Sequence, residues 1–241
     1  LGDGENYVAS DAPALLGKTR RFLFLEDGEL GVITPGKVNL MSLMTLAHAY
    51  RASTLIKWTA DMVEKDGYRH FMLKEIHEQP QRVADTFSAH LDPWRDEVSV
   101  PELSELKEAA QKWSRVSIIA CGTSYHAGML GKWYIENLAG IPCDVEIASE
   151  YRYRNPIVQE HQLAIAVSQS GETADTLAAS KEAQKRGADL LAICNSLGST
   201  LTRDAGATML TLAGPEIGVA STKAFTCQVA VFYVFALWLA A

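Results

Sequence analysis

The second half of the chain combines short apolar runs with longer helical patterns. Five runs without polar alternation are each expected to form a strand: 116–121, 143–147, 163–168, 190–195 and 208–212. Helical spacing recurs between or after them, at 124–139, 173–186, 200–205 and 221–239. Strands that lack polar alternation are buried on both faces, so the pattern predicts a parallel sheet covered by helices. With right-handed crossovers this is a doubly wound, three-layer α/β sandwich around a five-stranded sheet.

Residues 1–40 show β rather than helical patterning. Two apolar runs, 21–25 and 30–33, flank Asp27-Gly28, a dipeptide that favours a hairpin turn. An isolated hairpin is marginally stable in water, so these strands are expected to belong to a sheet completed elsewhere. Upstream, residues 10–16 are expected to form a helical turn with Ser10 as its cap.

Residues 41–105 are expected to connect these two parts. Apolar side chains recur at helical spacing from Phe71 to Phe87, and Pro80 is expected to break or kink that helix. Four polar side chains of the same helix are interpreted as a solvated face: Lys74, Glu75, Glu78 and Arg82. A second, acidic helix is expected at 101–112.

Composition and charge exclude several classes of protein. Apolar residues make up 48% and charged residues 21% of the chain, as in ordinary globular proteins. The 22 basic and 29 acidic side chains leave a net charge of −7, which argues against a nucleic-acid or anionic membrane partner. The four cysteines are far apart and are expected to be reduced, buried thiols of a cytoplasmic protein. Neither they nor the six histidines cluster as metal ligands do.

The C-terminal run 229–241 is wholly apolar. It is shorter than the roughly 20 residues that cross a bilayer, so we interpret it as a buried helix rather than an anchor. The chain begins with Leu1 rather than Met and stops inside that helical pattern. We therefore expect a piece of a longer protein.

Small hydroxyl residues follow three of the expected strands, in the loops 120–125, 167–173 and 193–200. Ligands of open α/β sheets bind at the carboxyl ends of strands, where helix N-termini present free N–H groups. Plain helix capping is the alternative for each loop. The loop 168–173 packs four neutral donors and Gly171 into six residues, more than capping requires. It predicts a phosphate or another anion held by neutral donors, since residues 111–241 carry 11 acidic and 10 basic side chains.

For several other candidate residues, a structural role is preferred to a role in ligand binding or catalysis. Ser199 and Thr200 are expected to cap a short helix, and Ser221 is either a cap or a ligand contact. The remaining candidates are interpreted as follows: Lys223 as a surface lysine, His126 as a structural residue, His70 and His77 as packing residues, and Cys121 as a buried thiol rather than a nucleophile.

Five segments together resemble the glutamine:fructose-6-phosphate aminotransferase family. They are CGTSY at 121–125, IPCDVEIASE at 141–150, SQSGETADT at 168–176, EIGVASTKAF at 216–225 and GYRHFMLKEIHEQP at 67–80. The resemblance covers nearly the whole chain. It implies the end of a glutaminase domain at 1–41, an interdomain linker with helices at 42–105, and a first sugar isomerase domain at 106–241 with flavodoxin-like strand order.

The family makes glucosamine 6-phosphate from fructose 6-phosphate, with ammonia released from glutamine, and uses no metal or organic cofactor. The resemblance implies a homodimer in which the following residues contact the phosphate and sugar: Thr123, Ser124, Ser168, Gln169, Ser170, Thr173 and, less directly, Val219 and Ser221. No catalytic residue is expected in this chain, because the family's nucleophilic cysteine matches a position before Leu1 and its other catalytic groups match positions after Ala241. Two alternatives stay open: a non-catalytic sugar-phosphate sensor, and a dimerisation module that binds no ligand.

Overall fold

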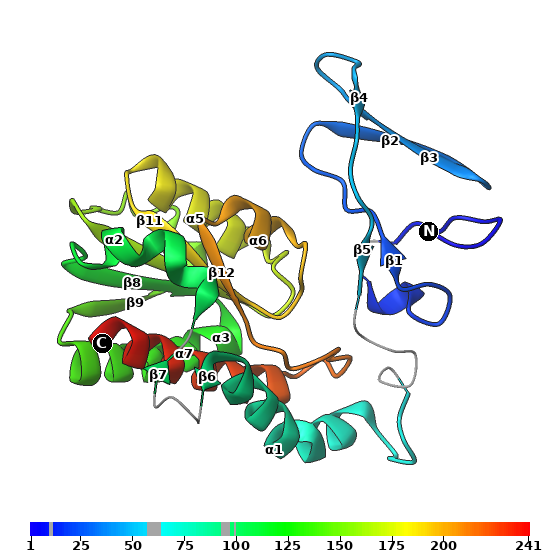
Figure 1. The fold of residues 1–241 in the computed structure, drawn as a ribbon. Helices are drawn as coiled ribbons and strands as arrows, with labels where there is room; N and C mark the ends of the chain where they lie inside the picture. The colour runs from blue at the N-terminus through cyan, green and yellow to red at the C-terminus, as the bar shows by residue number, and fades with distance from the viewer. Residues whose placement is uncertain (10–11, 57–63, 93–96, 99) are drawn as a thin grey trace. The chain divides into compact units, whose positions relative to one another are not determined.

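The computed structural model describes the chain except residues 10–11, 57–63, 93–96 and 99 (Figure 1). It forms two compact units, Leu1–Phe71 and Met72–Ala241. The first unit contains short strands. The second contains the five-stranded sheet and the helices that cover it.

All five strands of the large sheet are parallel, and their order is β12-β11-β10-β8-β9. Their bounds are β8 Arg115–Ala120, β9 Cys143–Ile147, β10 Gln162–Ser168, β11 Asp189–Cys194 and β12 Ala207–Leu210. Each begins within one residue of its predicted start. In chain order the arrangement is second, first, third, fourth and fifth, so the predicted flavodoxin-like, doubly wound fold is confirmed.

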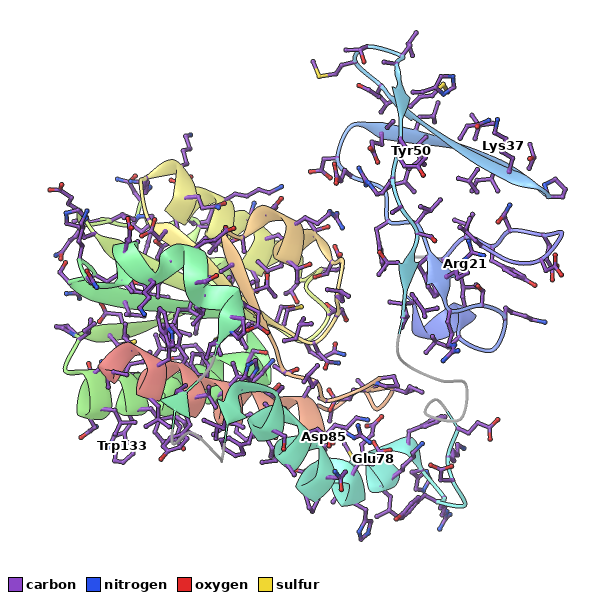
Figure 2. The ribbon with its side chains drawn as sticks, in the orientation of Figure 1. Arg21, Lys37, Tyr50, Glu78, Asp85 and Trp133 are labelled. Carbon is purple, nitrogen blue, oxygen red and sulfur yellow. The ribbon has the colours of Figure 1, made fainter. Side chains whose placement is uncertain are left out.

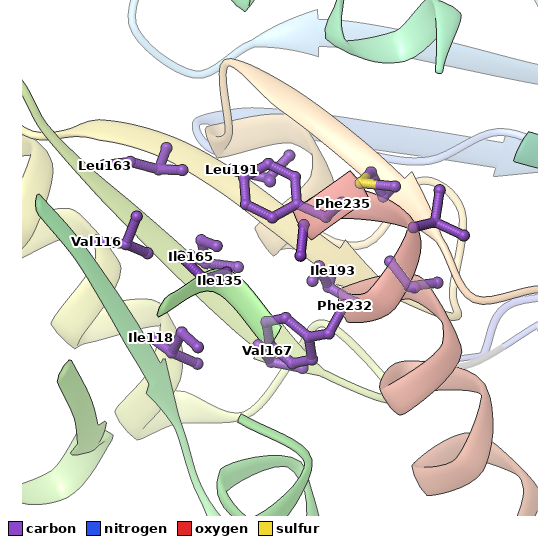
Figure 3. Close-up of a cluster of buried hydrophobic side chains, with 14 of the residues drawn as sticks. Val116, Ile118, Ile135, Leu163, Ile165, Val167, Leu191, Ile193, Phe232 and Phe235 are labelled. Atoms are coloured by element: carbon purple, nitrogen blue, oxygen red, sulfur yellow. The ribbon is translucent and has the colours of Figure 1, made fainter. Parts of the chain in front are cut away.

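Helices cover both faces of this sheet (Figures 1 and 3). On one face lie α3 (Gly122–Tyr134), its π-helical continuation η4 (Ile135–Ala139) and α7 (Lys223–Ala240); on the other lie α4 (Ala148–Tyr151), α5 (Ala174–Lys185) and α6 (Thr200–Asp204). Alternate residues of β10 serve the two faces. Leu163, Ile165 and Val167 join the cluster under α7, and two alanines, Ala164 and Ala166, join the cluster under α5.

The helix α7 is the apolar C-terminal run predicted to be buried. Phe232 and Phe235 are fully buried in the core (Figure 3). Gly131 of α3 makes the close crossing of the two helices possible, because a Cβ there would lie 2.5 Å from the Phe232 ring. By length and hydropathy alone α7 is a candidate membrane span among the described residues, but 56% of it is buried inside this fold.

The helix α1 (Phe71–His90) runs through Pro80 without ending there, so the predicted break is wrong. Proline has no N–H to bond the Ile76 carbonyl, four residues earlier. The Gln79 side chain supplies the missing donor, with Nε2 at 3.1 Å from that carbonyl oxygen. The side-chain amide thereby offsets part of the cost of proline inside a helix.

Two of the four polar side chains of α1 that were expected to be solvated are buried. Lys74 and Glu75 are only 3% and 2% exposed, whereas apolar Met72, Leu73 and Ile76 are each at least 37% exposed. The predicted packing residues His70 and His77 are exposed as well. Two later apolar residues of the helix, Val83 and Phe87, do pack against buried clusters, as expected. Which face is buried depends on tertiary partners that the local pattern does not reveal.

The shorter elements of the second unit come before the sheet. They are β6 (Leu91–Asp92), β7 (Glu97–Val98), the 3-10 helix η3 (Pro101–Leu106) and α2 (Lys107–Ala110). The acidic helix expected at 101–112 is therefore half 3-10 helix, and it starts with proline in its first turn.

In the first unit, strand pairing differs from the predicted hairpin. The strand β1 (Arg21–Phe22) pairs with β5 (Thr54–Leu55), and β2 (Glu29–Thr34) pairs with β3 (Lys37–Ser42), which also pairs with β4 (His48–Ala49). Pro35 and Gly36 form the two-residue hairpin loop, whereas Asp27-Gly28 is a turn between β1 and β2, which do not pair. The expected helical turn is a 3-10 helix, η1 (Pro13–Leu15), and its expected cap, Ser10, lies outside the described residues.

All four cysteines are free thiols, and three of them are buried: Cys143, Cys194 and Cys227. Burial raises the pKa of Cys143 to about 12 and also raises the pKa values of Cys194 and Cys227. Because the thiolate is the reactive form, we expect iodoacetamide at pH 8 to label Cys121 alone in the folded chain and all four thiols in denaturant. Mass spectrometry after short exposure measures this, and fast native labelling of a second cysteine would contradict it.

Candidate functional site

The strand order places two hydroxyl-rich loops at the switch point of the sheet. The strand β8 lies between β9 and β10, and Ala120 at its end is in register with Val167. From this point α3 leaves toward one face and α5 toward the other. The predicted loops 120–125 and 168–173 therefore begin side by side at the carboxyl edge of the sheet, where α/β folds bind ligands.

The loop 168–173 is held by bonds among its own donors. Ser168 Oγ accepts the Gly171 N–H at 3.0 Å and lies 3.0 Å from Thr173 Oγ1. Ser170 Oγ accepts the Glu172 N–H at 3.2 Å. Thr173 occupies the N-cap position of α5, but within the described residues its hydroxyl makes no capping bond. Simple helix capping therefore does not explain Thr173, and the first-turn N–H groups of α5 face the same edge as these hydroxyls.

The other predicted loop presents Thr123 and Ser124 in the first turn of α3. Thr123 is exposed, while Ser124 is 7% exposed and its Oγ accepts a hydrogen bond of 3.0 Å from Gln228 Nε2 of α7. Cys121, predicted to be buried, is the half-buried N-cap residue of α3. His126 is exposed and lies against the Tyr125 ring, so the structure gives it no buried structural role.

Gly171 is required by close packing against the third loop. Its φ is +71°, and a Cβ there would lie 2.6 Å from Ser199 Cβ and 2.9 Å from Cys194 Sγ. The prediction that Ser199 and Thr200 cap a short helix is wrong in detail. The Glu172 carboxylate accepts the Thr200 N–H at 2.7 Å, and Ser199, at the N-cap position of α6, makes no side-chain cap bond within the described residues. Glu172 therefore turns away from the hydroxyl cluster to cap α6.

Asn195 connects three segments at the end of β11. Its N–H bonds the Gln169 carbonyl at 3.2 Å, so it also fixes the backbone of a predicted site residue. Its Oδ1 accepts the Ala213 N–H at 2.9 Å, and its Nδ2 donates to the Gly214 carbonyl at 2.7 Å. Sequence reasoning treated Asn195 only as the last residue of a strand.

The segment before α7 carries the last two predicted site residues. Val219 is fully exposed and Ser221 is half-buried. Ser221 is not the helix cap, because the Glu216 carboxylate accepts the N–H groups of Thr222 and Ala224 at 2.9 and 3.1 Å. Sequence reasoning missed the roles of Glu172, Asn195 and Glu216. Glu172 and Asn195 act on backbone groups that are distant in the sequence, whereas Glu216 acts on N–H groups only six and eight residues after it.

Lys223 is not a surface lysine. Its side chain is 2% exposed, and Nζ lies 2.5 Å from Glu78 Oε2 of α1. The same carboxylate reaches Lys74 Nζ at 3.6 Å through its other oxygen. Figure 2 labels Glu78 on α1, beside the segment that leads into α7. The polar side chains of α1 thus form ion pairs within the second unit.

Electrostatics around the two adjacent loops is nearly neutral. Glu172 is turned to α6, and Asp175 in the first turn of α5 pairs with Arg152 at 3.1 Å. Among the described residues no three His, Cys, Asp or Glu side chains are grouped to hold a metal ion. The site offers hydroxyl and amide donors together with helix N-termini, which can hold an anion by geometry rather than by a basic field.

The model of the SIS domain family matches residues 110–238, which includes the whole sheet and both loops. The chain belongs to the SIS domain family.

Curated relatives match almost the whole chain. An enzyme of Methanosarcina acetivorans named glutamine–fructose-6-phosphate aminotransferase (isomerizing) is 47% identical over 237 residues, which are 98% of this chain and 38% of the relative. An enzyme of the same name from Symbiobacterium thermophilum is 47% identical over 240 residues, 99% of this chain and 39% of the relative. The chain therefore spans about two fifths of the length of these relatives.

A solved structure supports the same relationship. The C-terminal domain of glucosamine-fructose-6-phosphate aminotransferase from Francisella tularensis superimposes with a TM-score of 0.71 and 47% sequence identity. The match covers 74% of this chain and 50% of that chain.

Proposed function

We propose that this chain binds fructose 6-phosphate at the carboxyl edge of its sheet and releases glucosamine 6-phosphate from the same place. The observation that carries the proposal is the pair of hydroxyl-rich loops at the switch point between β8 and β10. A phosphate needs several donors at once. Hydroxyls and helix N–H groups provide them there without a lysine.

The proposed contacts divide between the two ends of the ligand. Ser168, Ser170 and Thr173 lie in one loop that suits the phosphate, with Gln169 between them. Thr123 and Ser124 approach from α3. Val219 and Ser221, in the segment before α7, are proposed to contact the sugar. In this division uncharged donors recognise the phosphate, and the segment before α7 selects the sugar.

The wider role is glutamine-dependent amination and isomerisation of fructose 6-phosphate, as the names of the relatives suggest. We place this role in the cytoplasm. Within it, we assign residues 106–241 to a sugar isomerase domain, 42–105 to a linker and 1–41 to the end of a glutaminase domain. This chain supplies the sugar-phosphate half-site of a homodimer, uses no cofactor, and leaves glutamine hydrolysis and the sugar chemistry to residues outside it.

Replacing Thr173 by alanine tests the proposal. Loss of one donor to a charged group should cost roughly 1–3 kcal/mol of binding free energy, which is about a 5- to 150-fold weaker affinity for fructose 6-phosphate. Isothermal titration of the 241-residue chain measures it. Thr173→Ser, which keeps the hydroxyl, should bind nearly as the wild type does.

The matched control is Thr202→Ala, because that hydroxyl bonds the Ser199 carbonyl within α6 and is not a proposed contact. It should leave the affinity unchanged. Equal affinity of Thr173→Ala and wild type would remove Thr173 from the site. A wild-type chain that binds no sugar phosphate would favour a dimerisation module instead.

A further inference from the structure

The segment 211–222, here called the crossing segment, runs along the carboxyl edge of the sheet. It leaves β12 at one end of the sheet, and Asn195 holds its Ala213 and Gly214 at the end of β11. It ends where α7 begins, and Gln228 of α7 bonds Ser124 in the first turn of α3. The crossing segment therefore passes from β11 toward the start of α3, beside the candidate site.

This segment has no helix or strand of its own to hold its main chain. Its middle is open to solvent, with Ile217 40% exposed and Val219 fully exposed. Backbone N–H groups in such a segment need acceptors from elsewhere if the segment is to keep one conformation. The structure supplies them from a helix far away in the sequence.

Glu75 of α1 is that acceptor. Its carboxylate accepts the Ile217 N–H at 2.7 Å and the Gly218 N–H at 3.0 and 3.3 Å. Glu75 is 2% exposed, so these charge-assisted bonds lie out of water, where they are strong. A Cβ at residue 218 would lie 2.5 Å from Glu75 Oε2. Glycine at 218 therefore permits this approach.

A second contact fixes α1 against the end of the same segment. Glu78, one helical turn after Glu75, pairs with Lys223 at the first position of α7. Carboxylates three residues apart lie on one helix face, so α1 holds the crossing segment at two neighbouring points. Both residues precede 110–238, the part of the chain matched by the family model.

We propose that Glu75 is a positioning residue for sugar recognition: it fixes the main chain at Ile217 and Gly218 and thereby holds Val219 and Ser221 toward the ligand. The inference rests on the proposed function, because it assigns the crossing segment to the sugar end. It predicts that loss of the Glu75 carboxylate weakens contacts to the sugar without weakening those to the phosphate.

The experiment compares Glu75→Ala and Glu75→Gln with wild type, using the 241-residue chain. Hydrogen exchange of the Ile217 and Gly218 amides should accelerate at least tenfold in Glu75→Ala and less in Glu75→Gln, which keeps one acceptor oxygen. Affinity for fructose 6-phosphate should fall about tenfold, whereas affinity for inorganic phosphate should stay within twofold. Asp85→Asn, on the same helix and labelled in Figure 2, should change neither.

Two results would overturn the positioning role. One is unchanged exchange of both amides in Glu75→Ala and Glu75→Gln. The other is an equal loss of affinity for both ligands, which would mean that Glu75 stabilises the fold in general. A wild-type chain that binds neither ligand would contradict the proposed function, and with it the positioning role. Titration of the wild type therefore distinguishes failure of the proposed function from failure of the positioning role alone. If Glu75→Ala does not fold, the isosteric Glu75→Gln decides both readouts.

Discussion

Gly171→Ala is expected to destabilise the chain by about 2–5 kcal/mol and to abolish sugar-phosphate binding. The left-handed φ of +71° costs a side chain roughly 1–2 kcal/mol. The new Cβ would also lie 2.6 Å from Ser199 Cβ, and relief of that overlap costs about 1–3 kcal/mol more. Because Gly171 lies between Ser168 and Thr173, the shift would also separate their hydroxyls. Urea denaturation and titration with fructose 6-phosphate measure the two effects.

Two further variants separate the causes of that loss. Gly187 has a φ of +99° and open space around its Cβ position, so Gly187→Ala should cost only the backbone strain of about 1–2 kcal/mol and leave binding intact. Adding Ser199→Gly to Gly171→Ala removes the overlap with the Ser199 side chain, although Cys194 Sγ stays close, and should restore part of the stability. Equal costs for Gly171→Ala and Gly187→Ala would show that the packing against the third loop is unimportant.

Glu78→Gln is expected to cost about 3 kcal/mol of unfolding free energy. The change leaves the Lys223 ammonium buried at 2% exposure without its carboxylate, and the same carboxylate also lies near Lys74. Removing one partner of a buried ion pair is strongly destabilising, because the remaining charge keeps its desolvation cost. Thermal and urea unfolding at neutral pH check the value.

The pair between Glu182 and Arg186 provides the control. Glu182 lies in α5 and Arg186 is the C-cap residue of that helix; both side chains are partly exposed and lie 2.6 Å apart. Glu182→Gln should therefore cost less than about 1 kcal/mol of unfolding free energy. If both substitutions cost the same small amount, the pair at Lys223 contributes little. The contact between α1 and α7 would then depend on apolar packing.

Much of the fold was predictable because its signals are local. Residues such as Ile118 and Ile165 lie in strands buried on both faces, and uninterrupted apolar runs are typical of such strands. The places of the candidate loops were predictable for the same reason: Ser168 ends one strand, Ser124 lies in the first turn of the helix after another, and both strands were expected to be parallel. Parallel strands place their carboxyl ends at one edge, and the observed pairing of β8 with β10 brings the two loops side by side there.

The failures share a different cause. Lys223 and Glu75 are polar residues on helical patterns, and a local pattern predicts exposure for both. Their partners lie 145 and 142 residues away, so only the folded chain shows that they are buried and bonded. The hairpin failed similarly, because Phe22 pairs with Thr54 and not with the apolar run that follows it.

The sequence by itself determined the fold class, the loops that form the candidate site and the resemblance that indicates its chemistry. Apolar runs and short motifs are local signals, so they can be recognised without knowledge of distant contacts. The tertiary structure alone decided which polar side chains of α1 are buried, which residues Gly171 packs against, and which side chains hold the crossing segment. Those features depend on pairs of groups that are distant in the sequence. The free energy of burying a charged side chain, or of packing a glycine closely against another loop, depends on the partner group, and only the folded chain brings that partner into contact.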